Sequence, residues 1–316
     1  MQGADRQAGK GGNAAESLVR GHSFTLVQLR YFAVAADQRT MTGASRVLMV
    51  SQSAVSTSIA QLERELGVQL FVRHHARGLS LTTAGEDFLR ELRPFLAHAS
   101  DLQDAARGVG RSVVGELVVG CFSTLAPFRL PVAVASFEAR FPEAHVRVVE
   151  GEHAQLQVAL REGRCEVAVM YGYDLGDLNH ALIDSLRPYV LVPADHALAG
   201  RESVRLTELT DHPMVLLDLP HTSNYFLSLF TARGLDQPVV RFRSPGFETV
   251  RSMVAHGHGF ALLNQRPTHD LTYDGTPVRL LELEDDVDAL DVVVAWPATS
   301  RLTRRAQEFI ALVSQV

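Results

Sequence analysis

The sequence predicts an α/β protein with three parts: a head dominated by α-helices, a long connecting helix, and a body of two α/β lobes. Three observations predict this class. Apolar residues recur at helical spacing over residues 24–82 before a short hairpin pattern, a heptad-like stripe follows over 83–108, and strand-like and helix-like runs alternate over 112–316. Residues 1–23 are rich in Gly, Ala and polar side chains without periodicity, so we expect a disordered leader there.

The chain has the composition of an ordinary globular protein. Its 316 residues are 46% hydrophobic and 21% charged, which is enough for two or three domains with buried cores. It contains no apolar run long enough to cross a bilayer, and residues 1–21 lack the apolar stretch of a secretory signal. We therefore expect a cytoplasmic protein without a membrane partner.

Charge is unevenly distributed along the chain. The net charge is −6, but residues 24–85 contain six arginines and three acidic residues, so this segment is basic. A mildly basic head on an acidic body is typical of a modular DNA-binding protein.

Residues 24–82 predict three short helices followed by a hairpin, which is the arrangement of a winged helix-turn-helix DNA-binding domain. The first has an apolar face over residues 26–36. We expect Thr40 to cap the second, which ends near Leu48, and Ser51 to cap the third, which Gly67 ends. The buried face of the third helix is predicted to consist of Val55, Ile59, Leu62 and Leu66.

The third helix and the hairpin behind it carry candidate DNA contacts. Short hydrogen-bonding side chains near the start of a helix are typical of a recognition helix in the major groove. Residues 70–73 and 79–82 predict a hairpin, or wing, whose arginines would reach phosphates or the minor groove. Taken alone, this segment also fits a small helical bundle whose polar side chains are simply solvated. The candidates are Thr40, Gln52, Ser53, Ser56, Thr57, Arg73 and Arg77.

A long helix is predicted next. Thr83 and Glu86 have the spacing of a capping box at its start, and Pro94 predicts a bend. Its apolar stripe needs a partner, which is either the same helix of a second copy or the body of its own chain. The stripe consists of Phe88, Leu92, Phe95, Ala99, Leu102 and Ala106.

The body shows a repeated β-α-β-α-β order. Strands at 117–120, 146–149 and 167–170 alternate with helices that begin near Pro127 and His153. A second set has strands at 214–217, 239–242 and 260–263, with helices that begin near Ser223 and Glu248. We expect the first lobe to cover about 112–172 and 298–316, the second about 173–297, with strands at 278–283 and 292–296 completing the second and a helix at 303–316 packing on the first.

Ligands of such α/β sheets bind beyond the carboxyl ends of strands, where helix N-termini offer free N–H groups. Each residue that this rule selects can equally well be interpreted, taken alone, as an ordinary helix cap. This rule selects Ser123, Thr124, Tyr171, His221, Thr222, Ser223, Phe247, Glu248 and Thr249, with Asn264 and Arg266 as weaker candidates.

Signs of catalysis, cofactors or metals are absent from the sequence. It has no Gly-x-Ser-x-Gly, no phosphate-binding glycine loop with its lysine, and no His or Cys cluster at metal spacing. Residues 256–259, His-Gly-His-Gly, fall at a helix-to-strand turn. The two cysteines, Cys121 and Cys165, lie beside strands and are expected to be buried and reduced, with a redox switch as the alternative.

Five blocks of the head together resemble the LysR-type transcriptional regulators, in order along the chain: LRYFAVA (29–35), SQSAVS (51–56), LERELG (62–67), LFVR (70–73) and LTTAG (81–85). Ser45 replaces an alanine usual in the second helix. Thr57 and Ser58 stand where many members carry Arg-Gln, which removes a phosphate or base contact that the resemblance implies there. The two-lobed body resembles type 2 periplasmic binding proteins, the sensor fold of that family.

The resemblance implies binding to dyad-containing double-stranded DNA as a homodimer or homotetramer paired through the long helix. It also implies control by a small-molecule effector in the cleft, a small polar or anionic metabolite, and contact with RNA polymerase is a further expectation. The alternatives are a DNA-binding regulator with a ligand-free assembly domain and a solute-binding protein. A polar, accessible cleft favours sensing, whereas side chains that fill the cleft favour assembly.

Overall fold

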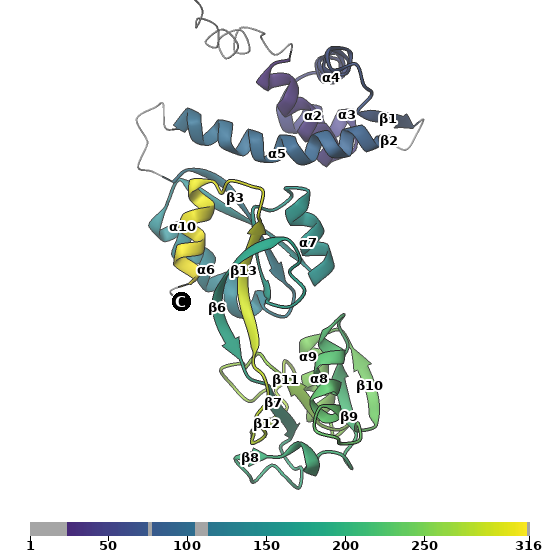
Figure 1. Ribbon diagram of the computed structural model, residues 1–316, viewed down its shortest axis with the longest axis vertical. Helices are drawn as coiled ribbons and strands as arrows, with labels where there is room; N and C mark the ends of the chain where they lie inside the picture. Colours follow the sequence, from purple (N-terminus) through teal and green to yellow (C-terminus); the bar gives the residue numbers. More distant parts are fainter. Residues whose placement is uncertain (1–23, 75–77, 105–112, 315–316) are drawn as a thin grey trace, which may run out of the picture. The chain divides into compact units, whose positions relative to one another are not determined.

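The computed structural model describes residues 24–74, 78–104 and 113–314 (Figure 1). They form two compact units, one running to Ala97 and the other beginning at His98. The predicted leader, the wing tip with Arg77, and the stripe position Ala106 lie outside the described residues.

The head has the predicted order of three helices and a hairpin. Thr40 and Ser51 cap the second and third helices through their side chains, and Gly67 ends the third in a left-handed conformation, which confirms these predictions. The paired strands β1 and β2 are antiparallel. The elements are α2 (Leu26–Gln38), α3 (Met41–Leu48), α4 (Gln52–Leu66), β1 (Phe71–His74), β2 (Gly78–Leu81) and then α5 (Thr83–Asp104).

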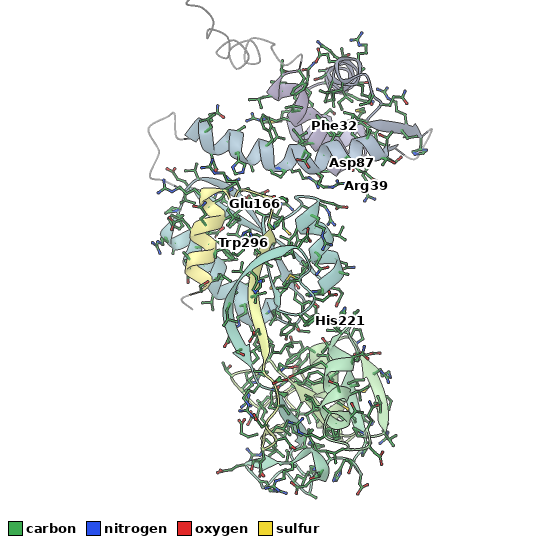
Figure 2. All side chains as sticks on the ribbon, in the orientation of Figure 1. Phe32, Arg39, Asp87, Glu166, His221 and Trp296 are labelled. Carbon is green, nitrogen blue, oxygen red and sulfur yellow. The ribbon has the colours of Figure 1, made fainter. Side chains whose placement is uncertain are left out.

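Phe32 lies at the centre of the head core (Figure 2). Its ring lies 5.2 Å from that of Phe71 on β1 and 5.4 Å from that of Phe88 on α5, measured between centroids. Val55 and Ile59 of α4 are fully buried in the same core. Apolar side chains from every helix of the head therefore meet in one cluster, which fixes the outward face of α4.

The start of α5 differs from the prediction by one residue. Thr82, not Thr83, provides the cap: its Oγ1 accepts a hydrogen bond from Gly85 N at 3.0 Å and donates to Gln69 O at 2.7 Å. A Cβ on Gly85 would come within 2.1 Å of the Leu70 carbonyl oxygen, so the first turn of α5 lies directly against the hairpin. This close approach brings Thr82 into the capping position.

The apolar stripe of α5 divides into a buried and an exposed half. Leu92 is 4% exposed and packs with Phe88 in the head core, whereas Phe95 and Leu102 are 50% and 73% exposed. The expectation that Phe88 and Leu92 wait for a partner helix is therefore wrong, because the first turns of α5 form a wall of the head itself. Phe95 and Leu102, seven residues apart, keep the predicted spacing on the exposed half.

The first lobe is built on a five-stranded sheet of order β4-β3-β5-β13-β6. Its first three strands are parallel, as predicted, and the other two run antiparallel. Its strands are β3 (Gly115–Phe122), β4 (Ala144–Gly151), β5 (Val167–Tyr171), β6 (Leu178–Leu186) and β13 (Leu290–Pro297), and its helices are α6 (Ala126–Arg140), α7 (His153–Arg161) and α10 (Arg304–Val313).

The second lobe contains a four-stranded sheet of order β11-β7-β12-β8 and a parallel pair, β9 with β10. A bridge between Met214 and Phe260 joins the pair to the larger sheet. Its elements are β7 (Tyr189–Pro193), β8 (Ser203–Val204), the short 3-10 helix η2 (Leu206–Glu208), β9 (Met214–Leu217), α8 (Thr222–Thr231), β10 (Val240–Ser244), α9 (Phe247–Ala255), β11 (Ala261–Leu263) and β12 (Val278–Leu283).

The lobe boundary differs from the predicted second-lobe range of 173–297. Strands β6 and β13 lie within that range, yet they pair with each other in the first-lobe sheet. The sequence did not predict β6, β7 or β8. Exposed and half-buried residues dominate β6, so it lacks the apolar signal of a buried strand.

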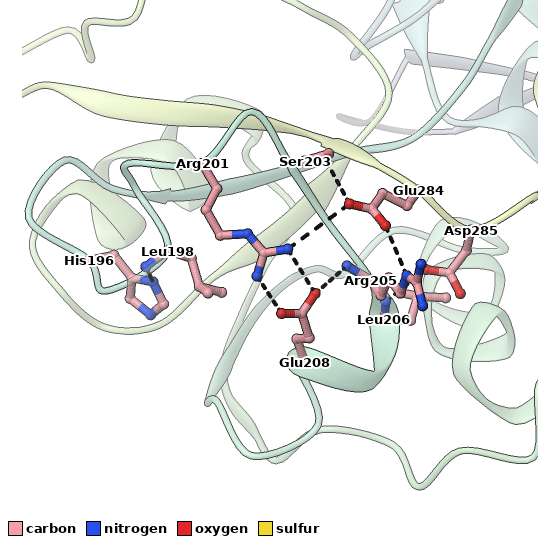
Figure 3. A network of polar contacts seen from close by, with 9 residues as sticks. All are labelled: His196, Leu198, Arg201, Ser203, Arg205, Leu206, Glu208, Glu284 and Asp285. Carbon is pink, nitrogen blue, oxygen red and sulfur yellow. Dashed lines mark hydrogen bonds and ion pairs between the residues drawn. The ribbon is translucent and has the colours of Figure 1, made fainter.

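An ionic network holds one edge of the second lobe (Figure 3). Glu284 accepts hydrogen bonds from Ser203 Oγ at 2.6 Å and from Arg205 Nε at 2.8 Å. Glu208 accepts from Arg205 N at 3.0 Å and pairs with Arg201. Because these side chains are largely exposed, each pair contributes little alone, but together they attach the 201–208 segment to the end of β12.

None of the helices described has both the length and the apolar character that would let it span a bilayer.

Candidate functional site

The start of α4 presents the predicted recognition residues. Gln52, Ser53 and Thr57 are exposed, and Ser56 is half-buried. Thr42 Oγ1 donates to Gln52 Oε1 at 3.3 Å, which steadies the glutamine amide across the α3–α4 turn. The structure therefore places these four candidates on one exposed helix start, where side chains can reach base edges.

Thr40 and the wing lie together on the same side of the head. Thr40 Oγ1 accepts from Gly43 N at 3.0 Å as the α3 cap, so its hydroxyl hydrogen stays available. Leu79 N of β2 donates to Arg39 O at 2.8 Å, which docks the wing on the α2–α3 turn. Arg73 is exposed on β1.

Glu63 joins α4 to the wing, and sequence reasoning missed this role. Its Oε1 accepts hydrogen bonds from Leu70 N at 2.8 Å and from Phe71 N at 3.1 Å. The side chain on the third helix thus sets where β1 begins. The available signal was a carboxylate three residues before the end of the helix and eight residues before the strand. Its partners are backbone N–H groups, which no sequence motif identifies.

A cavity of about 350 Å³ lies between the two lobes of the body. Four predicted ligand residues line it: Ser123 and Thr124 before α6, and Phe247 and Glu248 at the start of α9. Phe128, which was not predicted, faces Phe247 edge-on with ring centroids 5.5 Å apart. The walls therefore combine aromatic surface with hydroxyls, the usual character of a small-molecule site.

Further predicted residues meet around a smaller cavity of about 10 Å³. Thr124, Tyr171, Thr222 and Asn264 line it together with Phe247. The oxygens of Thr124 Oγ1 and Tyr171 Oη lie 3.4 Å apart. Burial raises the pKa of Tyr171, so its hydroxyl keeps its proton.

Several predicted residues are engaged elsewhere. Arg266 pairs with Glu282 and lies over the Tyr189 ring, so its charge is already matched by a carboxylate of the same chain. Thr249 is exposed on α9 and outside both cavities. Ser223 Oγ contacts Leu219 O at 3.4 Å, like an ordinary helix residue.

Glu248 is also neutralised within the chain, by a fully buried arginine that the sequence did not indicate. Arg251 Nε donates to Glu248 Oε2 at 2.9 Å, and its Nη2 donates to Leu271 O at 2.7 Å. Tyr273 N donates to the other carboxylate oxygen at 2.7 Å. Glu248 therefore shapes the cavity wall through its partners.

His221 lies between the two lobes, next to residues that the prediction omitted (Figure 2). Its ring centroid is 5.1 Å from that of Tyr173 and 6.0 Å from that of His153. Ser123 Oγ donates to Glu152 Oε1 at 3.4 Å, which links this group to the larger cavity. Glu152, His153 and Tyr173 follow β4 and β5, so the rule that selected Tyr171 also applies to them.

The described residues contain neither a metal-binding group nor a reactive thiol. No group of three or more His, Cys, Asp or Glu side chains within 24–74, 78–104 and 113–314 is arranged to hold a metal ion. Cys121 and Cys165 are both buried and unbonded. Burial raises the pKa of Cys121 far above its ordinary value and that of Cys165 to about 12, so both thiols stay protonated.

Comparisons with known proteins cover nearly all of the described chain. Residues 110–316 match the family model described as the LysR substrate binding domain, and residues 26–86 match that of the bacterial regulatory helix-turn-helix protein, lysR family. The HTH-type regulator YvbU of Bacillus subtilis is 26% identical, over 92% of this chain and 98% of its own length.

Two further relatives are more similar in sequence. A protein of Mycobacterium avium named as a probable hydrogen peroxide-inducible genes activator is 31% identical over 76% of this chain and 78% of its own length. The crystal structure of HinK, a LysR family transcriptional regulator from Pseudomonas aeruginosa, is 35% identical with a TM-score of 0.63, and the match covers 93% of this chain and 98% of HinK.

Proposed function

The chain belongs to the LysR family of transcriptional regulators, and on that premise we propose that a small molecule bound between its two body lobes controls how its heads hold promoter DNA. Members of this family are DNA-binding regulators with an effector-binding domain, and both parts are present in this chain. We assign regulation, not catalysis, as its activity. A protein that acts on the bacterial chromosome works in the cytoplasm.

The head reads and holds DNA with different residues. Gln52, Ser53 and Thr57 are exposed at the start of α4, where amide and hydroxyl groups distinguish base edges. Arg73 on the wing addresses phosphates, which positions the head without reading sequence. Ser45, on the short helix before α4, occupies a site where a small residue suffices.

Two heads act together on a dyad. Phe95 and Leu102 of α5 are exposed apolar side chains seven residues apart, which supports pairing with the same helix of a second copy. A dimer or a dimer of dimers then presents paired heads to two half-sites. RNA polymerase is the expected further partner at a promoter.

The cavity of about 350 Å³ carries the effector proposal. In a domain used only for assembly, we expect side chains to fill this space. A ligand bound in the cavity would contact α6 of one lobe and α9 of the other. A ligand that touches both lobes binds one lobe arrangement better than another, and this difference is what shifts an equilibrium. The DNA-binding head argues against the alternative of a solute-binding protein, which would not need such a domain.

Thr124→Val tests the site, because it keeps the shape of the side chain and removes the hydroxyl. We expect effector affinity to fall by roughly 1–2 kcal/mol while promoter binding without effector is unchanged. A thermal-shift screen of the full chain against metabolites identifies a ligand, and calorimetric titration then measures its affinity.

Thr249→Val is the matched control, since Thr249 is exposed on α9 and lines neither cavity. It should leave affinity unchanged. A Thr124→Val protein that responds to the effector as well as the wild type would place the site elsewhere. A ligand that binds without altering promoter affinity would refute the regulatory role.

A further inference from the structure

The cavity between the two lobes is walled mainly by apolar side chains. Phe128 of α6 and Phe247 of α9 meet edge-on, with ring centroids 5.5 Å apart, so aromatic surface continues from one lobe to the other. Tyr273 lines the same cavity and is 88% exposed, so most of its ring remains to be covered. Three proline rings add to the walls, those of Pro127, Pro245 and Pro267. Such walls suit a flat apolar body, of which an aromatic ring is the commonest kind.

Among the described residues, the acidic and basic side chains that line the cavity leave no charge unmatched. Arg251 donates from Nε to Glu248 Oε2 at 2.9 Å and from Nη2 to Leu271 O at 2.7 Å. It also acts on the Tyr189 hydroxyl, where it opposes the rise in pKa that burial causes. His269 Nδ1 accepts a hydrogen bond from Leu271 N at 3.3 Å, as only an uncharged ring can. The cavity therefore presents no net charge to a ligand.

Two helices begin at the cavity, and neither start suits an anion. Helix N-termini attract anions through free N–H groups and through the positive end of the helix dipole. At the start of α6, Pro127 lacks an N–H group, and Glu248 places a carboxylate in the first turn of α9. A ligand carboxylate would therefore gain less here than at a helix start without these two residues.

The carboxylates near the cavity are engaged as well, so a cation gains little. Glu248 is paired with Arg251, and its other oxygen accepts from Tyr273 N at 2.7 Å. Glu152 accepts from Ser123 Oγ at 3.4 Å, but it is not among the residues that line the cavity. As the N-cap residue of α7, it faces the positive end of that helix.

The polar groups that remain for a ligand are donors. Arg251 has only N–H groups, and more of them than Glu248, Leu271 and Tyr189 use. Thr124 lines the same cavity with a hydroxyl that can donate. An uncharged acceptor, such as a carbonyl oxygen, matches these groups without bringing a charge that the walls cannot balance.

We propose that the cavity binds an uncharged aromatic molecule that carries a carbonyl-type hydrogen-bond acceptor. This inference rests on the proposed function, because it names the chemical class of the effector, in place of the expected small polar or anionic metabolite. Phe128, Phe247 and Tyr273 cover the aromatic ring, while Thr124 and Arg251 supply the donors for the acceptor.

The test compares four probes of similar size on the full chain. Benzamide is uncharged and aromatic, benzoate and benzylamine carry opposite charges on the same ring, and cyclohexanecarboxamide is uncharged without an aromatic ring. Ligand-observed NMR titrations should show saturable binding of benzamide and at least tenfold weaker binding of both charged probes, since neither charge finds a partner on the walls. Cyclohexanecarboxamide should bind roughly threefold to tenfold more weakly, because aromatic contacts add to what buried area contributes.

Phe128→Leu keeps an apolar side chain and removes the aromatic ring. It should weaken benzamide binding by roughly threefold to tenfold and cyclohexanecarboxamide binding by less. Phe141→Leu is the matched control, because Phe141 is a half-buried aromatic residue at the other end of α6 and lines neither cavity. Glu248→Gln should shift the preference toward benzoate, since Arg251 keeps its charge and loses its carboxylate partner. Thermal melting checks that this variant is folded, and Phe128→Leu tests the inference independently of it.

Binding of benzoate or benzylamine as tight as that of benzamide overturns the inference and leaves the regulatory proposal standing. The same holds for equal binding of benzamide and cyclohexanecarboxamide, for an equal loss in Phe128→Leu and Phe141→Leu, and for an unchanged preference in folded Glu248→Gln. No saturable binding of benzamide also overturns it. Benzamide binding that follows these expectations but leaves promoter affinity unchanged supports the ligand class and refutes the regulatory proposal.

Discussion

Replacing Glu63 by alanine removes the carboxylate that holds the wing to the third helix. In the wild type, Glu63 Oε1 accepts from Leu70 N at 2.8 Å and from Phe71 N at 3.1 Å. Both of those residues are buried, so water replaces the lost acceptor poorly. Hydrogen bonds to a charged acceptor contribute about 1.5–3 kcal/mol each, but Glu63 is half-buried and solvent screens part of this.

We therefore expect the local stability of the β1 start to fall by about 2 kcal/mol, which corresponds to a roughly thirtyfold rise in the opening constant of these two amides. Hydrogen exchange on the full chain measures this directly at Leu70 and Phe71. Promoter affinity should fall as well, since the wing loses its fixed position beside α4.

Glu65→Ala is the matched control on the same helix, where Glu65 accepts a hydrogen bond from the Gln61 side chain. It should leave exchange at Leu70 and Phe71 within a few-fold of the wild type. Unchanged exchange in Glu63→Ala, or an equal rise in Glu65→Ala, would refute the assignment of Glu63 as the residue that anchors the wing.

Three further predictions concern DNA reading, assembly and pH. Gln52→Ala should relax discrimination between operator variants by about 1–3 kcal/mol, whereas Arg73→Ala should weaken binding to all operator sequences alike and reduce the salt dependence of affinity. Titrations of operator variants at two salt concentrations separate the two effects. A uniform loss of affinity in Gln52→Ala would contradict its role in reading bases. Leu102→Glu should leave the chain folded but dissociate the oligomer, as measured by sedimentation, while Leu92→Glu, inside the head core, should unfold the head. An unchanged oligomer in Leu102→Glu would exclude α5 as the helix that pairs two copies. Burial lowers the pKa of His153 below its ordinary 6.5, so the unfolded chain binds a proton that the folded chain does not, and stability should fall as pH drops below about 6.5. Thermal melts at pH 7.5 and 5.5 should show a smaller loss in His153→Gln, and an equal loss would contradict this.

Local signals predicted the head well. Thr40 and Ser51 cap their helices because a hydroxyl and a backbone N–H three residues later meet whatever the rest of the chain does. The stripe on α5 was harder to interpret, because periodicity identifies an apolar face but not its partner. Leu92 and Leu102 share that face, yet one packs in the head and the other is exposed.

The pairing of strands far apart in the chain could not be predicted from the sequence. Strand β13 lies in the first-lobe sheet because it pairs with β5 and β6, more than one hundred residues earlier, and no local pattern encodes that choice. The strand-end rule placed Ser123 and Thr124 on the cavity. It could not show that Phe128 of α6 and Phe247 of α9, more than one hundred residues apart in the chain, face each other across that cavity.

The pairing of β6 with β13 makes the second lobe a single continuous insertion into the first lobe. Leu186 and Leu290 are directly opposite each other across this pair, so the chain leaves the first lobe and returns to it at neighbouring points. Residues 187–289 are thus an insertion at the tip of what would otherwise be a plain β-hairpin. Recombination at these two points would graft a new half-cleft onto an unchanged head and first lobe, giving such regulators a route to new signals without rebuilding their DNA specificity.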